Sequence, residues 1–292
     1  MKQISLCIAA ALLFTSCGRF GNTDNKKDQQ ERIVCISKQY NEIIFALGAQ
    51  QNLVAVDVSS TYPPEIKKLP TVGYHRALSA EGITSQNPTL LLHDNNVGPE
   101  HVMKQLKDLK IPMRTFADSV VTIEQTKALI REMGAYFHKE QRAAELCNKL
   151  DSDMHRALNN AQQYSEHPKV MVIHFGQAMN VYMAMTRKSN AAKMINWAGG
   201  TLDLDGVKGM QQLSPEIVAQ ADPDVVLLTD FGYDRLGSID KIKELPGLAG
   251  TKAAKSNRIY RVEEHDMVYL GPRTGENVLL FQELIHRHAP SK

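Results

Sequence analysis

Side chains suited to binding chemistry are densest in residues 71–83, Thr-Val-Gly-Tyr-His-Arg-Ala-Leu-Ser-Ala-Glu-Gly-Ile. A glycine turn precedes Tyr74, His75 and Arg76, and Ser79 then opens a short helix. A phenolate is a good ligand for ferric iron, and a guanidinium can fork onto a carboxylate. The stretch predicts a site for a flat, anionic, metal-bearing ligand, although these residue types alone also fit an ordinary surface loop.

Tyrosine, histidine and arginine recur where strands are expected to end. Ligands of open parallel sheets gather beyond the carboxyl ends of the strands. Besides the trio at 74–76, the residues at these ends are Tyr40, Tyr62, His93, His174, Tyr233, Arg235, His265, Tyr269 and Arg273. A histidine directly after a buried strand, such as His174, fits a hydrogen-bonded core residue equally well. The pattern therefore predicts the location of a ligand site, but it does not assign a role to each residue.

The motifs of common enzyme classes are missing from the sequence. It contains no Gly-x-Ser-x-Gly, no phosphate-binding loop, no Gly-x-Gly-x-x-Gly and no His-Glu-x-x-His. Past the N-terminal region only Cys35 and Cys147 remain, too few for an all-cysteine iron–sulfur site. Each cysteine sits in an apolar pattern, which predicts a buried, inert thiol. We expect a binding protein rather than an enzyme.

The first 17 residues are typical of a lipoprotein signal peptide. A short basic start precedes an apolar run over residues 4–14, which is too short to span a bilayer. Small residues stand before Cys17, and Leu13 lies four residues ahead of it, as in a bacterial lipobox. We predict that Cys17 is lipidated, with a simple secretory signal as the alternative. The polar residues 18–31 are expected to form a flexible tether.

Composition indicates a folded protein that does not bind nucleic acid. Of 292 residues, 43% are hydrophobic and 23% charged, which suits a globular chain. The 34 Lys and Arg are scattered among 32 Asp and Glu, and the net charge is only +2. A nucleic-acid interface would need a basic patch, and none is visible.

Strands and helices alternate in two separate parts of the chain. Such alternation implies crossover connections and parallel sheets with helices on their faces. We predict one α/β lobe over residues 32–121 and a second over residues 166–292. The expected strands lie at 32–37, 52–58, 89–92, 112–116, 169–174, 224–228 and 258–262, and helices include 100–109, 190–197 and 275–288.

Residues 122–165 carry a different, helical pattern. Apolar residues recur there at three- and four-residue steps, with a break near His138. A helix of about 25 residues is about 37 Å long at 1.5 Å per residue. We therefore expect a linking helix that runs as a rigid strut from one lobe to the other.

The second lobe repeats a pattern of the first. Ser79-x-Glu81 is followed seven residues later by a proline and an apolar run, and Ser214-x-Glu216 repeats this at the same offsets. Two similar lobes leave a cleft between them, where small ligands commonly bind. The matched positions of Glu81 and Glu216 predict a pair of exposed carboxylates that dock onto paired arginines of a partner.

The chain resembles the periplasmic haem-binding proteins of ABC-type haem importers, within the group that also takes up siderophores and cobalamin. Residues 42–48, Glu-Ile-Ile-Phe-Ala-Leu-Gly, are similar to the first helix of that group, and residues 69–83 to its haem branch. The resemblance implies an α/β fold of two Rossmann-like lobes with parallel sheets, joined by a single long rigid helix, the class III periplasmic binding protein architecture. It also implies a monomer in the periplasm of a Gram-negative bacterium, anchored in the membrane through Cys17.

The resemblance also assigns roles to residues. Tyr74 would be an axial ligand of the iron of haem b, which is the transported cargo, and His174 matches a second ligand found in some members. Arg76 would meet a propionate. Glu81 and Glu216 would contact an ABC permease dimer in the inner membrane. The remaining residues expected around the propionates or the pocket are His75, Tyr233, Arg235 and Arg273.

Three alternatives stay open at this point. The same fold could carry a ferric siderophore or a corrinoid. The chain could instead carry zinc or manganese, with His93, His174 and His265 as ligands. A two-lobed metallocluster enzyme is the third, and the small number of cysteines argues against it.

Overall fold

The computed structural model describes residues 31–117, 120–177 and 179–287. The expected signal peptide with Cys17, and residues 18–30 of the expected tether, lie outside the described residues.

The first lobe is built on a parallel sheet. Its strand order is β2-β1-β3-β4, and Ile33, Val34 and Cys35 of the central strand pair in register with Leu90, Leu91 and Leu92. Both central strands are fully buried, as a sheet covered on both faces requires. The strands are β1 (Ile33–Cys35), β2 (Leu53–Val56), β3 (Leu90–Leu92) and β4 (Met113–Arg114), and the helices are α1 (Lys38–Leu47), α2 (Ala80–Thr84) and α3 (Glu100–Asp108). The parallel sheet expected over 32–121 is confirmed.

The second lobe contains a mixed sheet of order β7-β6-β5-β8-β9. Strands β5, β8 and β9 are parallel, whereas β6 and β7 run antiparallel to their neighbours. The expectation of a wholly parallel second sheet is wrong in this respect, because the sequence interpretation missed a hairpin that adds strands at one edge. The five strands are β5 (Val170–Gly176), β6 (Val181–Met185), β7 (Met210–Gln212), β8 (Val225–Thr229) and β9 (Ile259–Val262).

The helices of the second lobe include the repeat seen in the sequence. Ser79 Oγ accepts a hydrogen bond from the first turn of α2, and Ser214 Oγ does the same for α7. Each helix then leads into a strand, β3 or β8, that lies beside the first strand of its own lobe. The repeat is confirmed. The helices are α6 (Asn190–Trp197), α7 (Pro215–Ala221), α8 (Asp230–Leu236), α9 (Ile239–Lys243), α10 (Lys252–Lys255), α11 (Glu264–Val268) and α12 (Thr274–His286).

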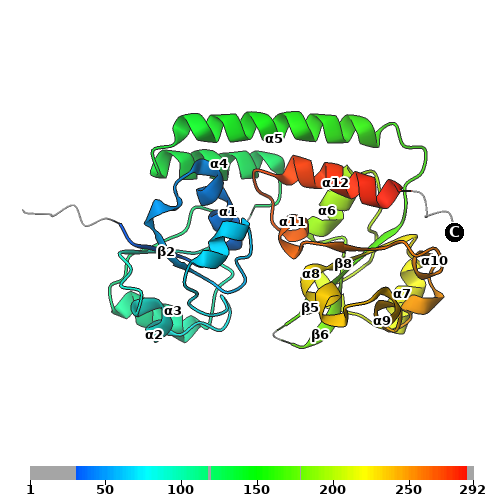
Figure 1. Cartoon of the computed structure of the whole chain (residues 1–292), viewed down its shortest axis with the longest axis horizontal. Coiled ribbons are helices and arrows are strands. Elements are labelled where there is room, and N and C mark those ends of the chain that lie inside the picture. Colours follow the sequence, from blue (N-terminus) through cyan, green and yellow to red (C-terminus); the bar gives the residue numbers. More distant parts are fainter. Residues whose placement is uncertain (1–30, 118–119, 178, 288–292) are drawn as a thin grey trace, which may run out of the picture. The chain divides into compact units, whose positions relative to one another are not determined.

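The linking region consists of two helices, α4 (Ile123–Tyr136) and α5 (Glu140–Ala161). The chain turns at His138, whose φ of 55° is left-handed, so the expected break is confirmed. At Gly134 a Cβ would lie 2.4 Å from Ala143 Cβ, and glycine lets the two helices close on each other. The strut is α5, whose 22 residues span about 33 Å. It packs against α1 of the first lobe and against α6 and α12 of the second (Figure 1).

The apolar core follows the alternation of the strands. Ile33 and Cys35 of β1 join a large cluster that also contains α4, α5 and the interior of the second lobe. Val34 and Ile36 point to the opposite face and join a smaller cluster under α2 and α3. One continuous core therefore links both lobes through α5. Among the described residues, no helix is both long and apolar enough to cross a membrane.

Candidate ligand-binding site

Tyr74 stands on a turn at the carboxyl end of β2. Val58 N donates a hydrogen bond to Gly73 O (2.9 Å), which ties the turn to the chain leaving that strand. Gly73 has a φ of 101°, a conformation that side chains other than glycine rarely adopt. Ala77 N then donates to Tyr74 O (2.7 Å) and closes the turn. The phenol is half-buried, so it is held by the lobe while remaining reachable.

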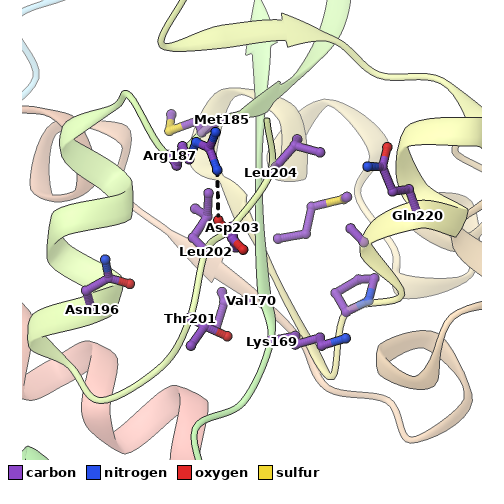
Figure 2. A pocket seen from close by; sticks show the side chains of 13 residues that line it. Lys169, Val170, Met185, Arg187, Asn196, Thr201, Leu202, Asp203, Leu204 and Gln220 are labelled. Carbon is purple, nitrogen blue, oxygen red and sulfur yellow. Dashed lines mark ion pairs between the residues drawn. The ribbon is translucent and has the colours of Figure 1, made fainter. Parts of the chain in front are cut away.

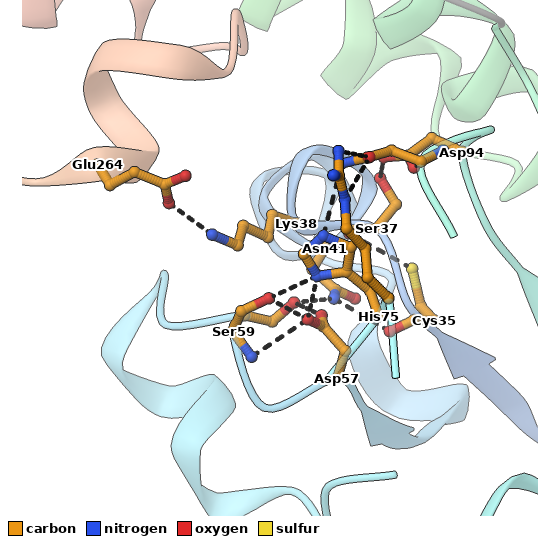
Figure 3. Close-up of polar contacts among 12 residues, drawn as sticks. Cys35, Ser37, Lys38, Asn41, Asp57, Ser59, His75, Asp94 and Glu264 are labelled. Carbon is orange, nitrogen blue, oxygen red and sulfur yellow. Dashed lines mark hydrogen bonds and ion pairs between the residues drawn. The ribbon is translucent and has the colours of Figure 1, made fainter. Parts of the chain in front are cut away.

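His75 points into the first lobe, toward Ser59 and Asp57. Its ring is buried, and its Nδ1 lies 3.0 Å from Ser59 Oγ and 3.3 Å from Asp57 Oδ2 (Figure 3). Burial raises the pKa of Asp57, but hydrogen bonds from His75, Ser59 and Ser60 outweigh it and hold that pKa below its usual value. The Tyr74 and His75 ring centroids are 4.4 Å apart. His75 thus lies behind Tyr74 and supports it.

Arg76 is exposed and fixed by one amide. Its Nε donates to Asn96 Oδ1 (2.9 Å), and its Nη2 donates to the same oxygen. Asn96 N in turn donates to Asp94 Oδ1 (2.9 Å), beyond the end of β3. The guanidinium therefore has a defined position beside the Tyr74 turn, and the residue stays exposed.

In the second lobe, His174 lies near the carboxyl end of β5. It stands one residue beyond the last pairing of β5 with β8, and its Nδ1 lies 3.1 Å from Thr229 Oγ1. Burial lowers the pKa of His174, and the charge of Glu264 offsets part of that effect. The imidazole is therefore neutral at pH 7 and able to act as a ligand.

A buried ion pair that the sequence interpretation missed connects the two lobes. Lys38 Nζ lies 2.5 Å from Glu264 Oε2, with 6% and 9% of the two side chains exposed. The same Nζ lies 5.3 Å from the ring centroid of Tyr269 and 5.7 Å from that of Phe231. A lysine in the first turn of α1 is unfavourable beside the positive end of the helix dipole. This was the one signal in the sequence that Lys38 has a charged partner elsewhere.

Tyr269 lies beside the ion pair of Lys38 with Glu264. Burial raises its pKa well above the usual value, and the charges of Glu264, Asp94 and Asp57 raise it further. Its ring centroid lies 5.3 Å from Nζ of Lys38 in the first lobe, which pairs with Glu264 in the second. We call Lys38, Tyr74, His174, Glu264 and Tyr269 the interlobe cluster.

Arg273 is already engaged by carboxylates. Its Nε donates to Glu42 Oε1 (3.0 Å), its Nη2 donates to Asp266 Oδ1 (2.6 Å), and its guanidinium lies 3.5 Å from the ring centroid of Tyr62. His265 Nε2 lies 2.6 Å from the other oxygen of Glu42. Opposing effects act on Glu42: burial raises its pKa, while His265 and Arg273 lower it and prevail. Glu42 of the first lobe is thus bound by two residues of the second lobe, His265 and Arg273.

Tyr233 and Arg235 lie on α8, which begins directly after β8. Arg235 is exposed, with its guanidinium 4.7 Å from the ring centroid of Phe175 and its Nη2 3.5 Å from Asn180 Oδ1. Tyr233 is half-buried against the core. Both residues therefore belong to the carboxyl edge of the second sheet, as expected from the sequence.

The histidines proposed for a metal ion are engaged separately. His93 Nδ1 lies 3.0 Å from Asp94 O, His174 faces Thr229, and His265 faces Glu42. Within residues 31–117, 120–177 and 179–287, no three His, Cys, Asp or Glu side chains form a group able to hold a metal ion. Cys35 and Cys147 are both buried free thiols, and burial raises the pKa of each.

A pocket of about 580 Å³ lies at the opposite edge of the second sheet (Figure 2). Its lining includes Val170 at the start of β5 and Pro223, two residues before β8, and Arg187 of the lining pairs with Asp203. None of the site residues expected from the sequence lines it. It is therefore separate from the carboxyl edge that carries the interlobe cluster.

Comparison with known proteins identifies the family. Residues 33–265 match the model of the periplasmic binding protein family. The chain belongs to that family.

Relatives of this periplasmic binding protein include proteins that bind different ligands. A solved structure of the periplasmic haem-binding protein RhuT from Roseiflexus sp. RS-1, in its apo form, is 34% identical, has a TM-score of 0.80 and covers 88% of this chain and 98% of its own. An uncharacterized ABC transporter substrate-binding lipoprotein, YvrC of Bacillus subtilis (strain 168), is 26% identical over 89% of this chain and 81% of its own length. A vitamin B12-binding protein of Pectobacterium carotovorum subsp. carotovorum (strain PC1) is 22% identical over 73% of each.

The two glutamates expected to dock a partner lie at equivalent places of the two lobes of the binding protein. Glu81 is exposed in the first turn of α2, and Glu216 is exposed in the first turn of α7. A hydrogen bond from Ser214 lowers the pKa of Glu216, so it is charged at neutral pH. Their role in docking stays a prediction.

Proposed function

We propose that this protein binds haem b in the periplasm and delivers it to an inner-membrane ABC permease, without catalysing a reaction. The observation that carries the proposal is the position of Tyr74, a half-buried phenol on a glycine turn beyond the carboxyl end of β2. Tyrosine-ligated haem iron is a known arrangement. The similarity to a haem-binding protein over 88% of the chain supports the same cargo.

In this proposal, Tyr74 supplies one axial ligand of ferric iron and His174 the other. His174 Nδ1 is engaged by Thr229, so its Nε2 is the nitrogen that binds. Arg76 and Arg235 meet the propionates, and Tyr233 lines the same edge. His75 and Arg273 stabilise the walls of the site, because their polar atoms are already paired.

The remaining assignments concern delivery. Lipidation at Cys17 would anchor a monomer to the membrane of a Gram-negative bacterium, with residues 18–31 as the tether. Glu81 and Glu216, one on each lobe, would contact the two halves of a permease dimer. Their equivalent positions in two similar lobes support docking onto a two-fold partner.

A hemin titration of the unlipidated protein, followed by absorbance, tests the proposal. The wild type should give a saturating Soret change. Tyr74→Phe keeps the ring and removes the iron-binding oxygen, so we expect loss of the phenolate-to-iron band and at least about tenfold weaker binding. His101→Gln, an exposed histidine on α3, is the control and should behave as wild type. An unchanged spectrum in Tyr74→Phe would remove Tyr74 from the site.

A corrinoid is the second candidate cargo, favoured by the similarity to a vitamin B12-binding protein. The same preparation should be titrated with cyanocobalamin by calorimetry. Tight cobalamin binding together with no Soret change on adding hemin would assign the corrinoid and overturn haem.

A further inference from the structure

We infer that Asp57, His75 and Asn96 form a hydrogen-bonded chain that positions Arg76 and Tyr74 for the ligand; the ligand part of this inference rests on the proposed function. The chain, which we call the relay, runs from the Asp57 carboxylate through the His75 ring and the Asn96 amide to the Arg76 guanidinium. Its members lie beyond the carboxyl ends of β2 and β3. They are positioning residues rather than ligands.

The relay begins at a fixed charge. Asp57 is fully buried, and its carboxylate accepts hydrogen bonds from Ser59 Oγ, Ser60 Oγ and Ser59 N. Since these bonds and His75 hold the Asp57 pKa low despite burial, the carboxylate is charged at neutral pH. A buried carboxylate of this kind requires a donor from His75.

The carboxylate selects the tautomer of His75. Asp57 Oδ2 lies 3.3 Å from Nδ1, so the ring carries its proton on Nδ1 and presents a lone pair at Nε2. Asn96 Nδ2 lies 3.5 Å from that Nε2 and donates to it. The buried carboxylate of Asp57 thus fixes the orientation of the Asn96 amide through the two nitrogens of the His75 ring.

The amide in turn has only one orientation. Because its NH₂ group faces His75, its Oδ1 faces Arg76 and accepts from Nε (2.9 Å) and Nη2. An arginine side chain has roughly 2 kcal/mol of rotamer entropy, and a preformed contact reduces how much of it is lost on binding. The relay therefore presents the Arg76 guanidinium already in place for a carboxylate.

The same imidazole directs Tyr74. The two ring centroids are 4.4 Å apart at an interplanar angle of 56°. Because the His75 ring cannot rotate without breaking its contacts to Asp57 and Ser59, the phenol rests on a fixed surface. Replacing His75 should therefore alter the geometry of the bond between Tyr74 and iron.

A double-mutant cycle on hemin affinity tests the relay. Asn96→Ala should weaken binding about tenfold in the wild type and cause no further loss in Arg76→Ala, because Asn96 acts through Arg76. His75→Phe should shift the phenolate-to-iron band, which a purely structural role would leave in place. Asn159→Ala removes a similar but exposed contact, Asn159 Nδ2 to His155 Nε2 (2.9 Å) on α5, and should have no effect. Equal losses from Asn96→Ala in both backgrounds would overturn the relay.

A measurement without ligand keeps the relay and the proposed function separate. By NMR relaxation of arginine Nε–H groups, Arg76 should be rigid in the wild type and mobile in Asn96→Ala and His75→Phe, with melting temperatures showing that the variants are folded. An equally rigid Arg76 in both variants would refute the relay. A wild type that fails to bind hemin would refute the proposed function, and the NMR result would still decide whether the relay exists.

Discussion

Replacing Glu264 by glutamine tests the buried ion pair between the lobes. Lys38 Nζ lies 2.5 Å from Glu264 Oε2, and both side chains are less than a tenth exposed. Removing one member of a buried pair costs about 3–5 kcal/mol, because the other charge stays buried without compensation. The rings of Tyr269 and Phe231 offset about 1 kcal/mol of that cost for the lysine. We expect Glu264→Gln to lower the free energy of unfolding by about 3 kcal/mol.

Urea unfolding at pH 7 measures this loss. The single tryptophan, Trp197, and far-ultraviolet circular dichroism supply two signals for the same transition. The matched control is the pair of Lys104 with Asp108 on α3, where 75% and 63% of the side chains are exposed. Asp108→Asn should change the free energy of unfolding by no more than about 0.5 kcal/mol.

The double variant Lys38→Met with Glu264→Gln supplies the second half of the test. It removes the unpaired cation, so it should be destabilised by less than the sum of the two single variants. If Glu264→Gln costs no more than the exposed control, or if the two changes are additive, the pair contributes nothing to the joint between the lobes and the reasoning fails.

Two further predictions concern other buried positions. Burial and the charges of Glu263 and Glu264 raise the pKa of Asp230 to about 6, so the folded state holds a proton that the unfolded state loses near pH 4, and stability falls as pH rises between these values. Asp230→Asn should therefore raise the free energy of unfolding at pH 8 by at most about 3 kcal/mol, seen as a higher melting temperature, and should leave it unchanged at pH 4. An equal gain at pH 8 and pH 4 would contradict the raised pKa of Asp230. At Gly275, where α12 meets α5, a Cβ would lie 2.8 Å from a backbone nitrogen, so Gly275→Ala should cost about 1–3 kcal/mol in urea unfolding. Gly250→Ala, with open space around it, should cost far less, and equal losses would show that the helix crossing tolerates a methyl group.

The sequence predicted those elements whose signal is local. The apolar run Leu90–Leu92 marks a strand buried on both faces, and Ser79 and Ser214 mark helix starts through bonds three residues away. The break at His138 was visible as an interruption of the helical period. The hairpin of β5 and β6 was missed, because the five residues Val181–Met185 carry too short a pattern to separate a strand from a loop.

The interlobe contacts had no comparable local signal. Lys38 and Glu264 are 226 positions apart, and Glu42 is 231 positions from Arg273. Glu42, Glu264 and Arg273 look like ordinary surface charges in the sequence. Lys38 is marked only by its place in a helix's first turn, and only the fold brings it to its partner. For the same reason the sequence, which predicted Arg273 for a propionate or the pocket, did not reveal its carboxylate partners Glu42 and Asp266.

The trio at 74–76 shows a different limit. The sequence predicted Tyr74, His75 and Arg76 as site residues of one segment, but residue types alone do not say how each side chain is directed. The turn directs them differently: Tyr74 is half-buried, His75 is buried against Asp57, and Arg76 is exposed on Asn96. Which of these three side chains can face a ligand depends on the φ of Gly73 and on the buried carboxylate of Asp57. Neither can be read from the residue types of the segment.

The distribution of buried charge favours the carboxyl edge as the functional edge. Asp57 follows β2, Asp230 follows β8 and Glu264 follows β9, and all three are buried. Buried ion pairs often contribute less to stability than apolar residues of the same size would, so stability alone does not explain why they gather there. Shifted pKa values cluster where proteins bind or react, and those of Asp57, Glu264 and Asp230 are all shifted. At the opposite edge, the pocket's own ion pair of Arg187 with Asp203 is mostly exposed, with 55% and 83% of the side chains accessible. The ligand should therefore be sought at the carboxyl edge, and a structure with hemin bound in the pocket beside Arg187 would reverse this argument.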